Sequence, residues 1–150
     1  NVVALTELTK ALLPGMLARG RGRIMNLGSV GSFVPGPLMA VYYASKAYVL
    51  SYSEALAEEL AGSGVTVTAL CPGLTRTGFQ ARAGLPAGMA QASRVTADVD
   101  DVARAGYAAM MRGARVVVPG LLNKLSTVLP RLAPRRAVTA AVKRIQSSRA

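Results

Sequence analysis

The residues with the clearest chemistry are a tyrosine, a lysine and a serine at regular spacing. Tyr42 and Lys46 lie four residues apart, and Ser29 lies thirteen residues before the tyrosine. Four residues make about one helical turn, so on a helix the first two side chains share one face. A lysine ammonium beside a phenol lowers the pKa of the phenol, which can then exchange a proton near neutral pH. Hydride transfer at a carbonyl or alcohol requires such a group, and Ser29 would hold the reacting oxygen.

Two neighbouring residues compete for these roles, and each is less suited to them. Tyr43 precedes Ala47 by four residues, so it has no cation one turn further along the helix. Ser32 lies only ten residues before the first tyrosine of the pair. We therefore favour Ser29 over Ser32, and the first tyrosine over Tyr43.

The composition excludes several classes of site. The chain has 150 residues and is 51% hydrophobic, which is typical of one globular domain, here residues 1–150. It contains no histidine, which removes Ser-His-Asp and Cys-His catalysis and most zinc or iron sites. Its single cysteine, Cys71, allows no internal disulfide and no cysteine-based metal site, and we interpret it as a small buried hydrophobe. We expect no metal.

Neither a secretory signal nor a membrane-spanning segment is visible in the sequence. The longest uncharged stretch, residues 24–45, contains three glycines and two prolines. Such a composition argues against a spanning helix. The simplest interpretation is a cytoplasmic protein.

The net charge of +11 is concentrated near the C-terminus. Residues 102–150 contain ten Lys or Arg and no Asp or Glu. Such a segment could contact nucleic acid or an anionic membrane surface. We favour a solvated helix face instead, so we expect no nucleic-acid partner and rank peripheral membrane contact as the lesser alternative.

Hydrophobic periodicity and turn residues predict an alternating order of helices and strands. We expect helices at 2–18, 42–61 and 98–111, strands at 23–27, 65–71 and 115–118, a loop at 30–41, an irregular segment at 74–96, and a helical segment at 121–148 interrupted by Pro130 and Pro134. This alternation predicts an α/β fold, in which about three parallel strands have helices on both faces.

Several short motifs occur together in this order. They are Asn1, Asn26-Leu27-Gly28-Ser29, the Tyr-x-x-x-Lys pair, and Cys71-Pro72-Gly73-Leu74-Thr75-Arg76-Thr77. With them the chain resembles the C-terminal half of a classical short-chain dehydrogenase/reductase, which is an NAD(P)-dependent oxidoreductase. A lone Tyr-x-x-x-Lys is a weak signal, whereas the combined set is strong. The resemblance implies a Rossmann-type, doubly wound parallel sheet that is only partly present here.

The resemblance also implies a role for each matching residue. Tyr42 looks like the catalytic acid/base, and Lys46 like the residue that lowers its pKa and binds the nicotinamide ribose. Ser29 looks like the group that polarises the substrate oxygen, and Asn1 like the asparagine that holds a water of the proton relay. The loop that contacts the nicotinamide side of the cofactor would include Pro72, Gly73, Thr75 and Thr77. The implied cofactor is NAD or NADP, the implied substrate is a small carbonyl or alcohol, and the implied assembly is a homo-oligomer.

One part of the family pattern is missing. No Gly-x-x-x-Gly-x-Gly or Gly-x-Gly-x-x-Gly turn, which would hold the pyrophosphate, occurs in this chain. We therefore interpret the chain as a fragment that lacks the main dinucleotide-binding half, with little activity expected from it alone. The alternatives are a relative of sugar epimerases or dehydratases, which share Tyr-x-x-x-Lys, and a non-catalytic binding fragment. The substrate pocket, with an apolar lining that favours an apolar substrate, would include Phe33, Val34, Leu38, Met39 and residues 78–96.

Overall fold

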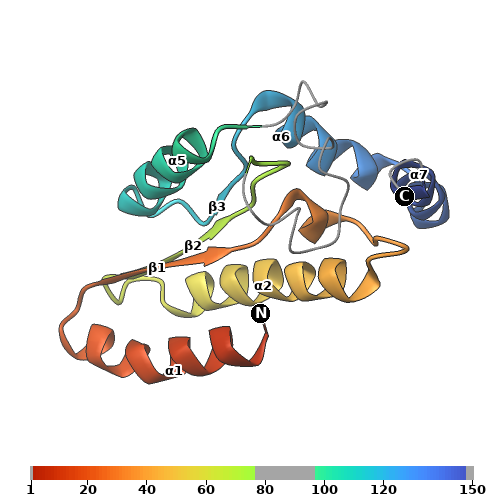
Figure 1. Ribbon diagram of the computed structural model, residues 1–150. Coiled ribbons are helices and arrows are strands. Elements are labelled where there is room, and N and C mark those ends of the chain that lie inside the picture. The colour runs from red at the N-terminus through yellow and green to blue at the C-terminus, as the bar shows by residue number, and fades with distance from the viewer. Residues whose placement is uncertain (1, 77–96, 148–150) are drawn as a thin grey trace.

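The computed structural model describes residues 2–76 and 97–147. Its elements are α1 (Val3–Ala18), β1 (Gly22–Leu27), the 3₁₀ helix η1 (Val30–Phe33), α2 (Ala40–Glu59), β2 (Val65–Leu70), α5 (Val99–Met111), β3 (Val116–Val117), α6 (Leu121–Val128), the 3₁₀ helix η2 (Leu129–Leu132) and α7 (Arg135–Ser147). The three strands form a parallel sheet in the order β1-β2-β3. Helices α1 and α2 cover one face of the sheet and α5 the other (Figure 1). The prediction of a partial parallel α/β sheet is confirmed.

The middle strand forms the centre of the sheet. Of its six residues, all except Thr66 are buried, and its sequence Val-Thr-Val-Thr-Ala-Leu is nearly continuously apolar or β-branched. This pattern is typical of a parallel strand covered on both faces. Strand β1 pairs with β2 from Gly22↔Val65 to Leu27↔Leu70, and its side chains alternate between the two faces.

Apolar side chains from α2 and the sheet form two packed clusters. One contains Leu50, Ala69, Cys71 and Val118, and the other contains Leu56, Leu60, Val65 and Val67. Partly buried neighbours extend each cluster to η1 and to α1, respectively. The C-terminal half of α2 is therefore held against the sheet, which supports the residues at its N-terminal end.

The structure differs from the sequence-based expectation mainly in the stretch between β1 and α2. The expected loop at 30–41 contains η1, and α2 begins at Ala40, two residues earlier than predicted. The helical segment after residue 120 divides at Pro130 and Pro134, as predicted, into α6, η2 and α7. Most of the segment expected to be irregular, residues 77–96, lies outside the described residues.

Within residues 2–76 and 97–147, no helix combines the length and the apolar composition needed to cross a bilayer.

Candidate active site

Ser29 lies just beyond the carboxyl end of β1 and begins η1. Its backbone is extended, and its Oγ accepts a hydrogen bond from the backbone N–H of Gly31 at 3.0 Å. In return, the Oγ of Ser32 accepts the backbone N–H of Ser29 at 3.2 Å. This reciprocal capping fixes the position of the Ser29 hydroxyl and leaves its O–H to donate. Ser32, the weaker candidate in the sequence, therefore holds Ser29 in place.

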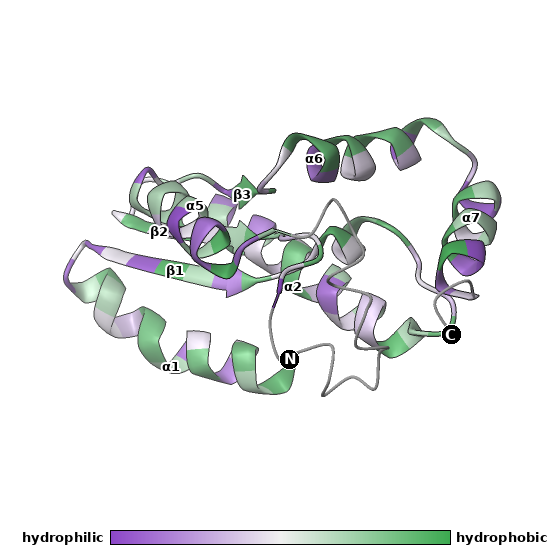
Figure 2. Ribbon diagram, turned by 45° about the horizontal axis from the view of Figure 1, so that its top comes forward, coloured by the Kyte–Doolittle hydropathy of each residue, from purple (hydrophilic) through white to green (hydrophobic). Residues whose placement is uncertain are grey.

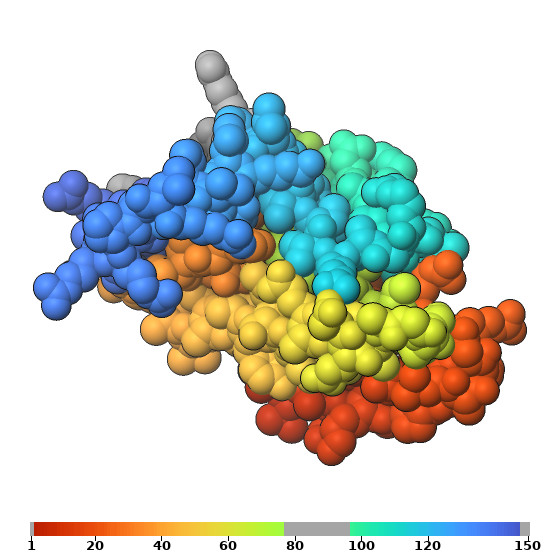
Figure 3. Space-filling view, turned by 180° about the vertical axis from the view of Figure 1, so that it is seen from behind, coloured from red at the N-terminus to blue at the C-terminus, as the bar shows by residue number. Residues whose placement is uncertain are grey.

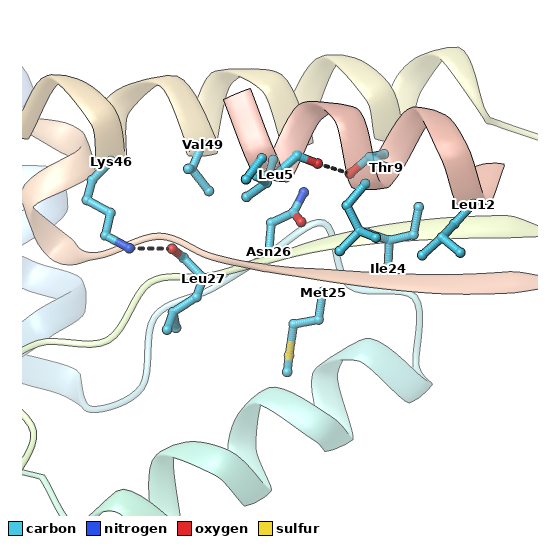
Figure 4. A pocket seen from close by; sticks show the side chains of 11 residues that line it. Leu5, Thr9, Leu12, Ile24, Met25, Asn26, Leu27, Lys46 and Val49 are labelled. Carbon is cyan, nitrogen blue, oxygen red and sulfur yellow. Dashed lines mark hydrogen bonds between the residues drawn. The ribbon is translucent and has the colours of Figure 1, made fainter. Parts of the chain in front are cut away.

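Lys46 carries its ammonium group to the end of the same strand. Its Nζ donates a hydrogen bond to the backbone carbonyl of Leu27 at 2.7 Å (Figure 4). Lys46 is only 9% exposed, and burial lowers the pKa of its ammonium group, an effect that nearby Cys71 opposes. Because Leu27 is two residues before Ser29, the ammonium and the serine lie at one end of one strand.

Tyr42 lies on α2 one turn before Lys46, as the sequence spacing predicts. It is half-buried, and its ring packs edge-to-face against Tyr43 with a centroid distance of 5.7 Å. Helix α2 thus presents Tyr42 and Lys46 on one face at the carboxyl end of the sheet.

Backbone hydrogen bonds join the loop after β2 to the Ser29 segment. The N–H of Gly28 donates to the carbonyl of Leu70 at 2.8 Å, and the N–H of Val30 donates to the carbonyl of Pro72 at 3.0 Å. The predicted Pro72-Gly73 loop therefore lies beside Ser29. Ligands of open parallel sheets bind at this edge, outside the carboxyl ends of the strands.

Asn123 of α6 packs against Gly73. A Cβ atom at Gly73 would lie well inside van der Waals contact with the Asn123 carboxamide. Asn123 is buried, and its Nδ2 donates to the backbone carbonyl of Pro119 at 2.7 Å. The sequence analysis missed this residue, because no local pattern connects position 123 with position 73.

The next part of the loop includes Thr75, whose Oγ donates to the carbonyl of Gly73 at 3.2 Å. Its backbone forms a parallel bridge with Ala97. The structure thus brings Ser29, Lys46, Pro72 and Gly73 together, with Thr75 two residues further along. The other two predicted site residues, Asn1 and Thr77, lie outside the described residues, as do residues 78–96 of the predicted pocket.

Tyr43 fills the space between α2 and the Ser29 loop. Its ring atoms lie 3.2 and 3.3 Å from the position of a Cβ at Gly31, and a Cβ at Gly36 would lie well inside contact with the ring. Its Oη accepts a hydrogen bond from Nε2 of Gln146 in α7 at 2.7 Å. The two glycines could have indicated a close approach, but the partner of Tyr43 is 103 residues away in sequence.

Cys71 lies directly beneath the site. It is completely buried, and its Sγ would be 2.8 Å from a Cβ at Gly28. Burial raises the pKa of the thiol, while hydrogen bonds from the Ser29 backbone and the Ser32 side chain act in the opposite direction. The interpretation of Cys71 as a buried small hydrophobe is confirmed.

An apolar groove of about 470 Å³ follows the outer edge of β1, beneath α1 and α2 (Figure 4). Lys46, Asn26 and Thr9 supply its polar lining, and Leu5, Leu8, Leu12, Ile24, Leu27 and Val49 are among the apolar residues. No described strand pairs with this edge of β1. Leu27 is 55% exposed there, which is unusual for an apolar residue of a parallel sheet.

Residues 1–88 match the model of the short chain dehydrogenase family. The chain belongs to this family. The chain is 34% identical over 129 residues to ketoacyl reductase HetN from Nostoc sp. (strain PCC 7120), and the match covers 86% of the chain and 40% of that relative. It is 46% identical over 78 residues to 2-keto-3-deoxy-L-fuconate dehydrogenase from Xanthomonas campestris, covering 51% of the chain and 26% of that relative.

Among solved structures, the short-chain dehydrogenase from Sphingobium yanoikuyae in complex with NADPH superposes with a TM-score of 0.71 at 34% identity. The match covers 96% of this chain and 52% of that one. The chain thus spans about half the length, or less, of the relatives it matches.

Proposed function

We propose that this chain supplies the proton-transfer part of an NAD(P)-dependent oxidoreductase that interconverts a carbonyl compound and an alcohol. The observation that carries the proposal is the convergence of Ser29, Lys46 and the Pro72-Gly73 loop at the carboxyl edge of the sheet. Tyr42 lies one helical turn from Lys46 on the same face. Polar groups gathered at this edge of a parallel sheet are typical of a ligand site.

Each side chain then has a defined part in the reducing direction. When bound, NADH or NADPH would supply the hydride for the carbonyl carbon. Ser29, whose Oγ already accepts the N–H of Gly31, donates its O–H to the carbonyl oxygen. Tyr42 gives that oxygen its proton, and the alcohol results. Lys46, held by the Leu27 carbonyl, would stabilise the tyrosinate, and the water that the family resemblance assigns to Asn1 would return the proton.

The residues present fit one end of NAD or NADP. Lys46 can donate to the hydroxyls of the nicotinamide ribose, and Pro72, Gly73, Thr75 and Thr77 would contact the nicotinamide side. The chain has no glycine-rich turn for the pyrophosphate. We therefore propose that an upstream half provides this turn, that one of its strands pairs with the open edge of β1, and that this half covers the apolar groove. The match to an NADPH-bound relative covers 52% of that relative's chain, which supports this arrangement.

The names of the relatives favour a dehydrogenase over a sugar epimerase or dehydratase, since those reported above are reductases and dehydrogenases. Phe33, Val34, Leu38 and Met39 follow Ser29 within ten residues and would line the substrate side, so we propose an apolar substrate. We also propose a homo-oligomer, as the family resemblance implies. A cytoplasmic location suits a chain with a single unpaired cysteine.

Neighbouring tyrosines allow a closely matched test. In the intact protein, with its upstream half, Tyr42→Phe should lower kcat by ~10²–10⁴-fold, the usual worth of a positioned acid–base group. NADPH binding, measured by fluorescence titration, should stay nearly unchanged because the ring is retained. Tyr43→Phe is the control, since it also removes one phenol hydroxyl but should retain turnover.

Turnover is measured as NADPH and NADH oxidation with a panel of ketones, aldehydes and 3-oxoacyl thioesters. A Tyr42→Phe protein that keeps more than about a tenth of the wild-type kcat would contradict the assigned role. A wild-type protein that binds NADPH and reduces none of the panel would favour the non-catalytic alternative.

A further inference from the structure

Helix α6 buries two polar residues and exposes all of its apolar ones. Asn123 and Thr127, one turn apart, are its buried residues. The opposite face of α6 and its continuation η2 carry six apolar side chains that are 45–82% exposed: Leu121, Leu122, Leu125, Val128, Leu129 and Leu132. This orientation is the reverse of an ordinary surface helix, whose apolar stripe faces the core.

The spacing shows that these side chains form one stripe. Relative to Leu121 they occupy positions i, i+1, i+4, i+7, i+8 and i+11, which lie on one side of a helix with 3.6 residues per turn. The inward orientation of the polar side is fixed by the Asn123 bond to the Pro119 carbonyl and by the packing of Asn123 against Gly73. The helix therefore cannot turn its leucines inward without breaking contacts behind the active-site loop.

The segment that carries the stripe is also rich in cations. Residues 121–147 contain Lys124, Arg131, Arg135, Arg136, Lys143 and Arg144, all exposed, and no acidic residue. Helix α7 has no fully buried side chain, and Figure 2 shows hydrophobic and hydrophilic segments alternating along α6 and α7. Exposed leucines flanked by lysine and arginine are typical of helices that lie in the plane of a membrane interface.

The position of this surface leaves it accessible when the upstream half is in place. Helix α6 follows β3 directly, and β3 and β1 form opposite edges of the sheet. In the view from behind, α6 crosses the upper part of the molecular surface (Figure 3). A strand added at β1 would therefore not cover the leucines. Pairing two copies through these faces would oppose like charges, because the segment has no acid to balance its cations.

We propose that residues 121–147 form a docking surface for an anionic lipid bilayer, with the leucines of α6 and η2 inserted and the cations at the headgroups. The sequence alone favoured a solvated basic face, and the outward leucines reverse that preference. Asn123, and through it Gly73, would then lie on the side of α6 that faces away from the lipid, one helix thickness from it. An apolar substrate dissolved in the bilayer would then lie close to the candidate active site.

The test uses the intact protein and sedimentation with vesicles of phosphatidylglycerol and phosphatidylcholine, or of phosphatidylcholine alone. We expect binding to the anionic vesicles that weakens with salt. Neutralising Lys124, Arg135 and Arg136 together (K124Q, R135Q, R136Q) should weaken it about fivefold per cation, or about 100-fold in all. Leu121→Ser with Leu125→Ser should weaken it about tenfold or more per leucine.

The control is Val3→Ser with Leu17→Ser, which removes exposed apolar side chains from α1 and should leave binding unchanged. NADPH titration checks that each variant remains folded. Equal binding to both vesicle types, or binding insensitive to the α6 variants, would overturn the proposal. So would leucine variants that convert a dimer to a monomer, or that only lower thermal stability, since these results assign the leucines to a second copy or to the protein's own interior.

Discussion

A single methyl group at Gly36 should loosen the loop that carries Ser29, because the ring of Tyr43 occupies the place of that methyl group. A Cβ at Gly36 would lie well inside van der Waals contact with three ring carbons of Tyr43. The ring cannot easily move away, since Gly31 confines it on the other side and Gln146 holds its hydroxyl at 2.7 Å. Gly36→Ala must therefore displace Tyr43 or the loop.

The expected loss of unfolding free energy in Gly36→Ala follows from overpacking around the Tyr43 ring. Overpacking a close-packed site costs about 1–3 kcal/mol of unfolding free energy. Gly36 does not have a positive φ angle, so alanine is otherwise tolerated there and should even stabilise by about 0.4–1 kcal/mol through the unfolded chain. In a Tyr43→Ala background the clash is gone, and Gly36→Ala should be neutral or slightly stabilising. In a double-mutant cycle, the coupling energy between Gly36→Ala and Tyr43→Ala should therefore be at least about 1 kcal/mol.

Urea unfolding of the wild type, both single variants and the double variant of the intact protein measures this energy, provided the m-values agree. Gly15→Ala is a suitable control, because Gly15 lies inside α1 and only the flexible Arg19 guanidinium is near, at 3.1 Å. Gly15→Ala should raise the free energy of unfolding by roughly 0.5–1 kcal/mol. If Gly36→Ala costs the same with and without the Tyr43 ring, the ring does not brace the loop and the reasoning fails.

Three further predictions concern Cys71, Lys46 and Gly73. Because Cys71 is completely buried and its pKa is raised, iodoacetamide should label it at about pH 8 only after unfolding, and rapid native labelling seen by mass spectrometry would contradict this. Burial lowers the pKa of Lys46, so the unfolded chain binds its proton more tightly. The unfolding free energy of the wild type relative to Lys46→Met should therefore rise with pH towards the ordinary lysine value of about 10.4, and a flat difference would exclude the effect. Gly73→Ala should break the bond from Asn123 to the Pro119 carbonyl and destabilise by about 1–3 kcal/mol, a loss that should largely disappear in an Asn123→Ala background in urea titrations.

Local patterns predicted most of the helices and strands and placed Tyr42 and Lys46 on one helix face. The β-branched run of β2 and the helical spacing of Tyr42 and Lys46 depend only on neighbours within one element, so both could be predicted. The position of Ser29 followed from its place at the end of a strand. These features concern short-range geometry, which the order of residues determines directly.

The parts that could not be predicted depend on contacts between distant segments. Gln146 and Tyr43 meet across 103 residues, and Asn123 reaches Gly73 from a different element. The sequence shows that the apolar side chains of α6 share one face, but it does not show whether that face points to the core or to solvent. A helical repeat shows which side chains share a face, whereas only packing decides which face meets the core.

The amides at the open edge of β1 report whether another strand has joined the sheet there. The N–H groups of Gly22 and Gly28 both point towards β2, so those of Ile24 and Asn26 do as well, because the direction alternates along a strand. The amides of Met25 and Leu27 therefore point to the opposite side, along the apolar groove. Their hydrogen-exchange rates distinguish a sheet that ends at β1 from one that continues, and a strand added there would slow these two amides while leaving those of Ile24 and Asn26 nearly as they were.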